Sequence, residues 1–283
     1  MYKMIIIDLD GTLLNDEKEV SREDIYTINR AYKEKGVISV IATGRSYVCA
    51  EYLANLIGEG ISQYIIANTG SIIRDNRKKT YLCEVCISIS DTIKILETAK
   101  KYNLNCIIDT NSKVISNHRL VNQDNLKKIG QPFEIIKEDL INYVKNNNIE
   151  TVQMTVIGSE NNLLKLKEDL NNLENIEITE LCKSKNLDEN KIEELTYVDI
   201  MRRGITKKKA IETLAKYQNI NKGEIIVIGD GGNDIPMFET GGLKVAMGNA
   251  LDIVKEKADY ITASNNENGV SKAIRKFVFN EDI

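Results

Sequence analysis

The sequence predicts an α/β protein with a Rossmann-like core, built on a parallel sheet, and an inserted α+β domain. Three observations support this prediction. Short apolar runs alternate with amphipathic helical patterns up to about residue 80, the rhythm changes from about Cys83, and it resumes after Tyr197. Strands that alternate with helices indicate right-handed crossovers and a parallel sheet. We therefore expect a core at residues 1–83 and 191–283 and an inserted domain at residues 84–190.

The first part of the chain reads as β-α-β-α-β. We expect strands at residues 4–7, 37–42 and 64–67. Ser21 and Asp24 form a capping-box pattern before a helix that Gly36 ends, and Ser46 is placed to cap the next helix. The apolar faces of these two helices are formed by Ile25, Ile28, Ala31 and Tyr32, and by Val48, Tyr52, Leu53 and Leu56.

The middle part mixes helices with strands that are not joined by crossovers. Its expected elements are a helix at 91–102, a hairpin of strands 104–109 and 114–116, a helix around 140–144, a strand at 151–157, a helix carrying Leu163, Leu166, Leu170 and Leu173, and a strand near 176–179. The polar run 183–190 is interpreted as the linker back to the core, although its composition equally suits a surface loop.

The last part returns to α/β patterning, with strands expected at residues 224–228, 243–247 and 260–262. Thr206 is placed to cap a helix whose first turn holds Lys207, Lys208 and Lys209. Cations in a first turn oppose the helix dipole unless an anion or nearby carboxylates compensate. We therefore select Lys207 as a functional candidate and interpret the other two lysines as a solvated face.

The composition is that of an ordinary globular protein. The 283 residues are 42% hydrophobic and 28% charged, with a net charge of −4, which argues against a nucleic-acid partner. No segment is long and apolar enough for a membrane span, and the N-terminus enters a strand at once. We expect a cytoplasmic protein whose five cysteines are free thiols.

Two sequence features are weak candidates for chemistry. Cys83 and Cys86 have C-x-x-C spacing, but a strand at residues 82–89 would point their sulfurs to opposite faces, which disfavours a zinc or redox role. His118 is the sole histidine and lies in a polar run, where a solvated loop position is the simpler interpretation.

The strongest candidate site lies where the first strand ends. Asp8 and Asp10 follow this strand directly, and Gly11 lets the chain turn. Two carboxylates this close repel each other unless a cation joins them, which suggests Mg²⁺. A plain turn after a strand is the competing interpretation. Asp230 also follows an apolar strand, whereas Asp234 suits an N-cap before Pro236.

Four blocks of the sequence, in order and spacing, resemble the haloacid dehalogenase superfamily of phosphatases, and within it the Cof-type branch (subclass IIB), which carries a large α/β cap. The matching stretches are DLDGTLL from Asp8, ATGR from Ala42, Lys207 within residues 199–211, GDGGND from Gly229, AMGNA from Ala246 and NENGVSKAI from Asn266. The family commonly has Glu, Pro and Gly where this chain has Asp199, Arg202 and Lys208. Arg202 and the neighbouring Arg203 would favour an anionic substrate or are surface residues, and we favour the latter.

The resemblance implies a mechanism and a set of site residues. Asp8 would form an aspartyl-phosphate, and Asp10 would protonate the leaving alkoxide and then help deprotonate water. Mg²⁺ would be held by Asp8, the backbone carbonyl of Asp10, and Asp230. Asp234 would complete the metal site by orienting metal-bound water or Lys207. The phosphoryl oxygens would be held by Thr43, the backbone amides near Leu9 and Gly44, Lys207 and Asn233.

The implied substrate is a small phosphate ester, with sugar phosphates the leading expectation, and the inserted domain would act as a lid. Two alternatives stay open. A phosphomutase of the phosphomannomutase type would return the phosphoryl group to a sugar, and a non-catalytic phosphometabolite-binding protein would keep the pocket without turnover. The sequence does not give the oligomeric state.

Overall fold

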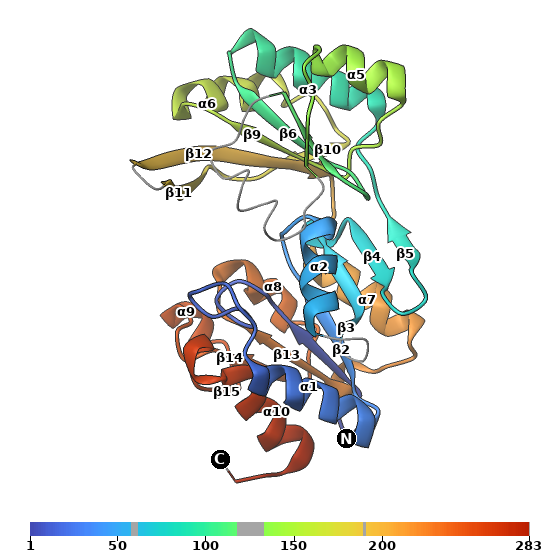
Figure 1. Cartoon of the computed structure of the whole chain (residues 1–283), viewed down its shortest axis with the longest axis vertical. Helices are drawn as coiled ribbons and strands as arrows, with labels where there is room; N and C mark the ends of the chain where they lie inside the picture. The colour runs from blue at the N-terminus through green and yellow to red at the C-terminus, as the bar shows by residue number, and fades with distance from the viewer. Residues whose placement is uncertain (58–61, 118–132, 189–190, 283) are drawn as a thin grey trace. The chain divides into compact units, whose positions relative to one another are not determined.

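The computed structural model describes residues 1–57, 62–117, 133–188 and 191–282. These residues form two compact units (Figure 1). Unit 1 comprises residues 1–45, 53–83 and 206–283, and unit 2 comprises residues 46–52 and 84–205. The mixed α/β architecture that the sequence predicts is confirmed. Among the described residues, none of the helices combines the length and apolarity needed to cross a membrane.

Unit 1 is built around an eight-stranded sheet with the strand order β15-β14-β13-β1-β2-β3-β4-β5. Its strands are β1 (Met4–Ile7), β2 (Ile38–Ala42), β3 (Ser62–Ala67), β4 (Ile72–Asp75), β5 (Thr80–Glu84), β13 (Ile225–Gly229), β14 (Leu243–Ala246) and β15 (Tyr260–Ile261). The six strands from β15 to β3 pair in parallel, and β4 runs antiparallel to β3. Strand β1 is buried along its whole length, as a central parallel strand requires.

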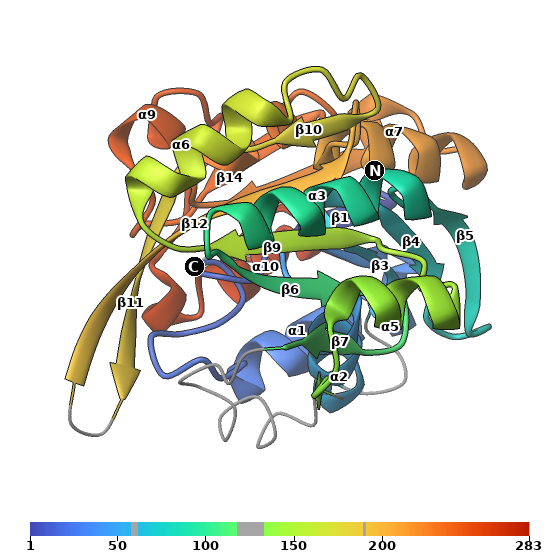
Figure 2. The ribbon, with the colours of Figure 1, turned by 90° about the horizontal axis from the view of Figure 1, so that it is seen from above.

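Helices cover both faces of this sheet. They are α1 (Arg22–Lys35), α2 (Tyr47–Ile57), α7 (Lys207–Tyr217), α8 (Ile235–Phe238), α9 (Asp252–Lys255) and α10 (Gly269–Phe279), with short 3₁₀ turns η1 (Asn68–Gly70), η2 (Lys222–Glu224), η3 (Gly232–Asp234) and η4 (Asn265–Glu267). Figure 2 shows α1 and α10 on one side of the sheet and α7 and α9 on the other. Ser271 donates its backbone N–H to Asp24 at 2.7 Å, which ties α10 to α1.

The expected helix caps at Ser21, Ser46 and Thr206 are confirmed. The Ser21 side chain accepts the backbone N–H of Asp24, and Gly36 ends α1 in a left-handed conformation. Ser46 accepts the N–H of Cys49 at the start of α2. Thr206 accepts the N–H of Lys209, which begins α7 where the sequence predicts it.

Unit 2 contains a seven-stranded, mostly antiparallel sheet. Its path is β10-β12-β9-β6-β7-β8, and β11 pairs with β12. Its elements are α3 (Ile89–Lys101), β6 (Asn105–Asp109), β7 (Val114–Ser116), β8 (Phe133–Ile135), α5 (Leu140–Asn147), β9 (Gln153–Ile157), α6 (Glu160–Asp169), β10 (Ile176–Ile178), β11 (Cys182–Asp188) and β12 (Lys191–Arg202). The predicted hairpin of β6 and β7 is confirmed.

The core of unit 2 lies between its sheet and the helices α3, α5 and α6, which Figure 1 shows together on one face. Ile95 of α3, Val144 of α5 and Leu163 of α6 are fully buried in this core, together with Met154 and Val156 of β9. Alternate residues of β9 therefore form the buried face of the strand. The leucines of α6, which recur at helical spacing, form the buried face of the helix.

Two sequence expectations about unit 2 are wrong. The polar run 183–190 is not a linker, because residues 182–188 form β11 and pair with β12 in antiparallel register. The chain also remains in unit 2 up to Ile205, since β12 pairs with β9, β10 and β11. The return to unit 1 therefore falls at Thr206, later than the expected boundary at residue 191. His118 lies outside the described residues.

Candidate active site

The parallel register of β1 and β13 brings two acids to one edge of the sheet. Ile7 pairs with Ile228, and Asp8 donates its backbone N–H to the Ile228 carbonyl at 3.1 Å. Asp8 follows β1 and Asp230 follows β13, so both lie beyond the carboxyl ends of adjacent central strands. Ligands of open α/β sheets bind at this edge.

Lys207 joins Asp8 to Asp234 from the first turn of α7. Its Nζ donates to Asp8 Oδ1 at 2.6 Å and to Asp234 Oδ1 at 2.9 Å. All three side chains are at most 7% exposed. A cation in a first turn is unfavourable alone, and here two buried carboxylates compensate it. Lys208 instead pairs with the exposed Glu239, as expected for a solvated face.

Burial and charge set the ionisation of this group. Burial raises the pKa of Asp8 to about 7; the charge of Lys207 opposes this rise, and the charges of Asp234 and Asp230 add to it. Burial alone would lower the pKa of Lys207, but the charges of Asp8 and Asp234 raise it above its ordinary value. Lys207 is therefore a cation in the folded protein, held between two carboxyl groups.

Asp230 is held beside this group by the turn after β1. Thr12 Oγ1 donates to Asp230 Oδ1 at 2.7 Å. Gly11 has φ +74°, and a Cβ at this position would lie 2.3 Å from Asp230 Oδ2. The turn thus requires glycine both for its backbone conformation and for the close approach of Asp230.

Asp234 is more than the N-cap that its position suggested. It precedes α8, yet its side chain makes no capping bond to that helix. Besides Lys207, it accepts the backbone N–H groups of Asp230 and Gly231, each at 3.2 Å. Asp234 therefore orients both the lysine and the loop that carries Asp230.

Asp10 points to a different partner. Its carboxylate accepts hydrogen bonds from Arg45 Nε at 2.6 Å and Arg45 Nη2 at 2.5 Å, and Lys18 Nζ lies 3.3 Å from its Oδ1. Burial raises the pKa of Asp10, but the hydrogen bonds and charge of Arg45 outweigh burial, so the pKa lies below its ordinary value.

The remaining predicted residues lie on neighbouring loops. Leu9 and Thr43 are buried, and Thr43 directly follows β2, whose Ile41 pairs with Ile7. Gly44 and Asn233 are exposed. Among the described residues, no side-chain hydrogen bond links Thr43 or Asn233 to the group around Lys207, so the sheet register alone places Thr43 near Asp8.

The acid group fits a hard divalent cation. Asp8, Asp230 and Asp234 each offer a carboxylate oxygen, and these atoms lie within 4.8 Å of one another. An all-oxygen set of this kind suits Mg²⁺ or a similar ion. Burial raises the pKa of Asp230, with Asp234 adding to the effect. A bound cation would relieve this concentration of negative charge.

Sequence reasoning did not select three residues that shape the site. Arg45 donates hydrogen bonds to Asp10, and Thr12 donates one to Asp230. Asn249 donates a hydrogen bond from its side-chain amide to the Gly11 carbonyl at 2.8 Å. All three residues lie within the stretches that resemble the family, so the resemblance was the feature of the sequence that could have identified them. Arg203 instead donates to the Ile176 carbonyl in unit 2, in agreement with a surface role.

Comparisons with known proteins agree with this geometry. A family model described as haloacid dehalogenase-like hydrolase matches residues 5–274. The chain belongs to this family. Its sequence resemblance to the Cof-type branch is thereby confirmed.

Similar proteins share almost the whole chain. A Bacillus subtilis phosphatase, 5-amino-6-(5-phospho-D-ribitylamino)uracil phosphatase YcsE, is 33% identical over 277 residues, covering 98% of this chain and 96% of that protein. A second 5-amino-6-(5-phospho-D-ribitylamino)uracil phosphatase of the same organism, YwtE, is 30% identical, covering 95% of this chain and 96% of that protein. A haloacid dehalogenase-like hydrolase structure from Bacteroides thetaiotaomicron has a TM-score of 0.81 at 26% identity, covering 98% and 99%. This chain is a haloacid dehalogenase-type phosphatase.

Proposed function

We propose that this phosphatase is Mg²⁺-dependent and hydrolyses phosphate monoesters of small sugars or polyols through an aspartyl-phosphate on Asp8. The observation that carries the proposal is the buried contact of Asp8 with Lys207 beside Asp230. It combines a carboxylate, a fixed cation and a second acid at the edge of the sheet where α/β proteins bind ligands. Unit 1 is the catalytic core in this proposal, and unit 2 is the cap.

The metal would be held by Asp8, Asp230 and the backbone carbonyl of Asp10, with Asp234 supporting the site. When bound, Mg²⁺ would neutralise charge on the phosphoryl oxygens. The donors fit this assignment because they are oxygen atoms and because no described residue of the acid group offers sulfur or imidazole. Gly11 keeps Asp230 close to the turn that carries Asp10.

Asp8 performs the first chemical step in this proposal. One carboxylate oxygen of Asp8 attacks phosphorus, the P–O bond to the leaving group breaks, and Asp10 gives its proton to the departing alkoxide. Lys207 balances charge on the phosphoryl group, with Thr43, Asn233 and the backbone amides near Leu9 and Gly44 as further donors. Asp10 then takes a proton from the water that hydrolyses the acyl phosphate, which restores Asp8.

The substrate class rests on two arguments. The resemblance implies small phosphorylated metabolites, and two relatives that span nearly the whole chain are named for a phosphoribitylamino-uracil substrate. A ribityl phosphate is a polyol phosphate, so the substrate panel should combine sugar phosphates with phosphorylated polyols. A cytoplasmic location and the absence of nucleic-acid partners belong to the same proposal, because such metabolites are small and intracellular.

The deciding experiment measures inorganic phosphate release from this panel, with and without Mg²⁺, for the wild type and for Asp8→Asn. We expect Mg²⁺-dependent release by the wild type and none by the variant. The matched control is Asp252→Asn, an exposed aspartate of unit 1, which should retain full activity. Turnover by Asp8→Asn would overturn the role of Asp8. Transfer to a sugar without phosphate release would instead support a phosphomutase.

A second experiment separates the roles of the two acids. Asp10→Asn should slow the release of alkyl leaving groups, which need a proton, far more than the release of aryl leaving groups such as p-nitrophenolate. Rapid quench with a ³²P-labelled aryl phosphate should still trap label on the protein. Equal losses with both ester types would contradict the acid role of Asp10.

A further inference from the structure

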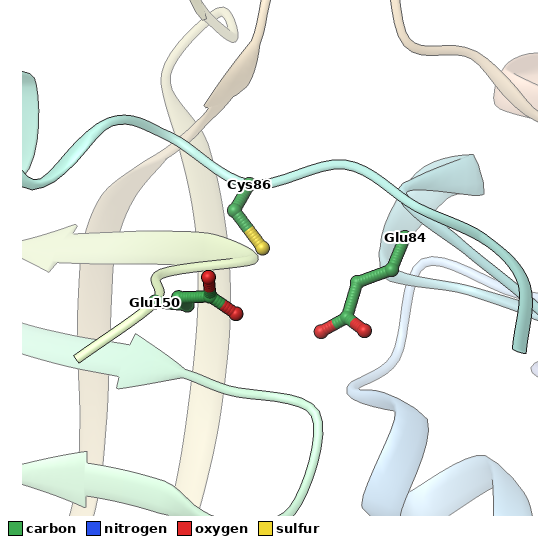
Figure 3. Close-up of side chains that lie close together, drawn as sticks. All are labelled: Glu84, Cys86 and Glu150. Carbon is green, nitrogen blue, oxygen red and sulfur yellow. The ribbon is translucent and has the colours of Figure 1, made fainter. Parts of the chain in front are cut away.

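A second cluster of metal-ligating side chains lies in unit 2. Glu84, Cys86 and Glu150 each offer one ligand atom, and these three atoms lie within 4.8 Å of one another. Figure 3 shows the Cys86 sulfur pointing to the Glu150 carboxylate, with the carboxylate of Glu84 directed into the same space. Glu84 is the last residue of β5 but falls in unit 2, as do Cys86 and Glu150, so the cluster is separate from the acids around Lys207.

A backbone contact holds two of these ligands in place. Ile87 and Thr151 form an antiparallel bridge, in which Ile87 donates its N–H to the Thr151 carbonyl at 2.8 Å. Both residues are buried, at 1% and 0% exposure. Because side chains alternate along extended backbone, Cys86 and Glu150 project away from the interior on a common side of the bridge. Their proximity therefore follows from the packing of the unit.

The three side chains have no competing partners within the described part of the chain: no hydrogen bond or ion pair joins any of them to another side chain there. The Oε1 atom of Glu84 is buried from solvent and lacks a hydrogen-bond partner. Leaving such an atom unsatisfied is costly. Burial and the charges of Glu84 and Glu150 raise the pKa of the Cys86 thiol to about 11. The group thus brings two carboxyl groups and a thiol together with one unsatisfied carboxyl oxygen, and no cationic side chain of the described residues pairs with them.

We propose that Glu84, Cys86 and Glu150 form a Zn²⁺ site. A thiolate favours a borderline-soft ion over Mg²⁺ or Ca²⁺, and carboxylates are common further ligands of Zn²⁺. Three protein ligands leave the fourth tetrahedral position to water. Zinc–sulfur and zinc–oxygen bonds of about 2.0–2.3 Å require the side chains to move closer, and the exposed Glu150 is free to rotate toward the ion. Binding would release the thiol proton to solvent.

The site differs from the C-x-x-C pair that the sequence suggested. Residues 82–89 do not form the continuous strand that was considered for this pair, since β5 ends at Glu84 and α3 begins at Ile89. The partners of Cys86 are two glutamates, one of them distant in sequence, and not Cys83. A metal at this position would join two segments of unit 2. Glu84 is the first residue of the stretch 84–205, and Glu150 lies between α5 and β9.

The test uses Co²⁺ as a spectroscopic replacement for Zn²⁺, added to the reduced, full-length protein. A thiolate ligand gives a sulfur-to-cobalt charge-transfer band, which the all-oxygen acid group of unit 1 does not produce. We expect the band in the wild type, its persistence in Asp8→Asn, and its loss on titration with one equivalent of Zn²⁺. Absence of the band in the wild type would overturn the proposal.

Three variants locate the ligands. Cys86→Ser should abolish the band, whereas the matched control Cys83→Ser should retain it, since Cys83 is a half-buried thiol outside the cluster. Glu150→Gln replaces an exposed side chain and should weaken Zn²⁺ binding at least about tenfold in competition with a chromophoric chelator. A band that survives Cys86→Ser, or unchanged affinity in Glu150→Gln, would overturn the assignment. None of these measurements depends on phosphatase activity.

Discussion

Arg45 holds both carboxylate oxygens of Asp10, through Nε at 2.6 Å and Nη2 at 2.5 Å. This two-point contact is stronger and more directional than a single ion pair. It stabilises the charged form of the residue that we assign as the acid in the first step. Arg45 is therefore placed to set the pH range over which Asp10 can donate a proton.

We predict that Arg45→Gln shifts the alkaline limb of the kcat/KM profile for an alkyl phosphate to higher pH. Removing the guanidinium raises the pKa of Asp10, so the carboxyl group stays protonated over a wider range. Arg45→Lys should shift the alkaline limb less, because lysine retains the positive charge but cannot make the two-point contact with the carboxylate. Lys18→Gln is the comparison: Lys18 also lowers the pKa of Asp10, but it lies farther away and is mostly exposed, so its loss should shift the limb less than the loss of Arg45. Coincident profiles for the wild type and Arg45→Gln would contradict this role.

Replacing Lys207 should destabilise the protein as well as inactivate it. Lys207→Met leaves the carboxyl groups of Asp8 and Asp234 buried without their cation, and loss of one partner of a buried pair costs about 3–5 kcal/mol. Urea unfolding followed by circular dichroism measures this loss, because the chain has no tryptophan. Without the charge of Lys207 the Asp8 carboxyl group binds a proton more readily, so the loss should shrink toward acidic pH.

The control for this prediction is Lys208→Met in the same helix turn. Lys208 pairs with Glu239 at the surface, where ion pairs contribute little. Its unfolding curve should overlay that of the wild type. Equal destabilisation by both variants would show that α7 needs positive charge in general, and that the buried contacts of Lys207 have no special importance.

The sequence was sufficient for the central strands of unit 1 and for most helices and strands of unit 2, but it missed β11 and β12 and therefore misplaced the end of unit 2. Acids that follow apolar strands can be placed at one sheet edge, which is why Asp8 and Asp230 were grouped correctly with Lys207. The strand β11 was missed because its residues are polar and lack the alternation of a half-buried strand. The contact of Cys86 with Glu150 depends on a long-range bridge between two irregular segments, and no local pattern encodes it.

A half-buried carboxyl group in unit 2 provides a prediction about pH and stability. Burial raises the pKa of Asp199, although Thr155 Oγ1 donates a hydrogen bond to Oδ1 at 2.6 Å. The folded state therefore binds the proton more tightly than the unfolded state. The stability that the protonated form contributes is complete below the unfolded pKa of about 3.9 and is lost as pH rises through the higher folded value.

Asp199→Asn keeps an acceptor for Thr155 and removes the charge, so it should raise the free energy of unfolding at neutral pH. The gain should diminish toward pH 4 in a series of urea titrations. Asp169→Asn is the matched control, because hydrogen bonds from Lys101 and Tyr102 lower the pKa of Asp169. It should instead destabilise at neutral pH and lose its effect in acid. A gain for Asp199→Asn that is independent of pH would exclude titration as the cause.

Replacing Gly11 tests whether the turn after β1 supports the proposed metal site. In Gly11→Ala the new Cβ would meet Asp230 Oδ2 at 2.3 Å, and φ +74° disfavours alanine in any case. We expect a stability loss of about 1–2 kcal/mol, together with a higher Mg²⁺ concentration for half-maximal phosphatase activity. The second effect follows because the displaced Asp230 loses its bond from Thr12 and its place beside Asp8.

Gly36→Ala separates backbone strain from the displacement of Asp230. Gly36 has φ +67°, close to that of Gly11, but no atom lies within 4 Å of its would-be Cβ. This variant should lose a similar amount of stability while its Mg²⁺ requirement stays at the wild-type value. If Gly11→Ala also left the Mg²⁺ requirement unchanged, Asp230 would not be a metal ligand, because a carboxylate forced from its position cannot hold the ion as before.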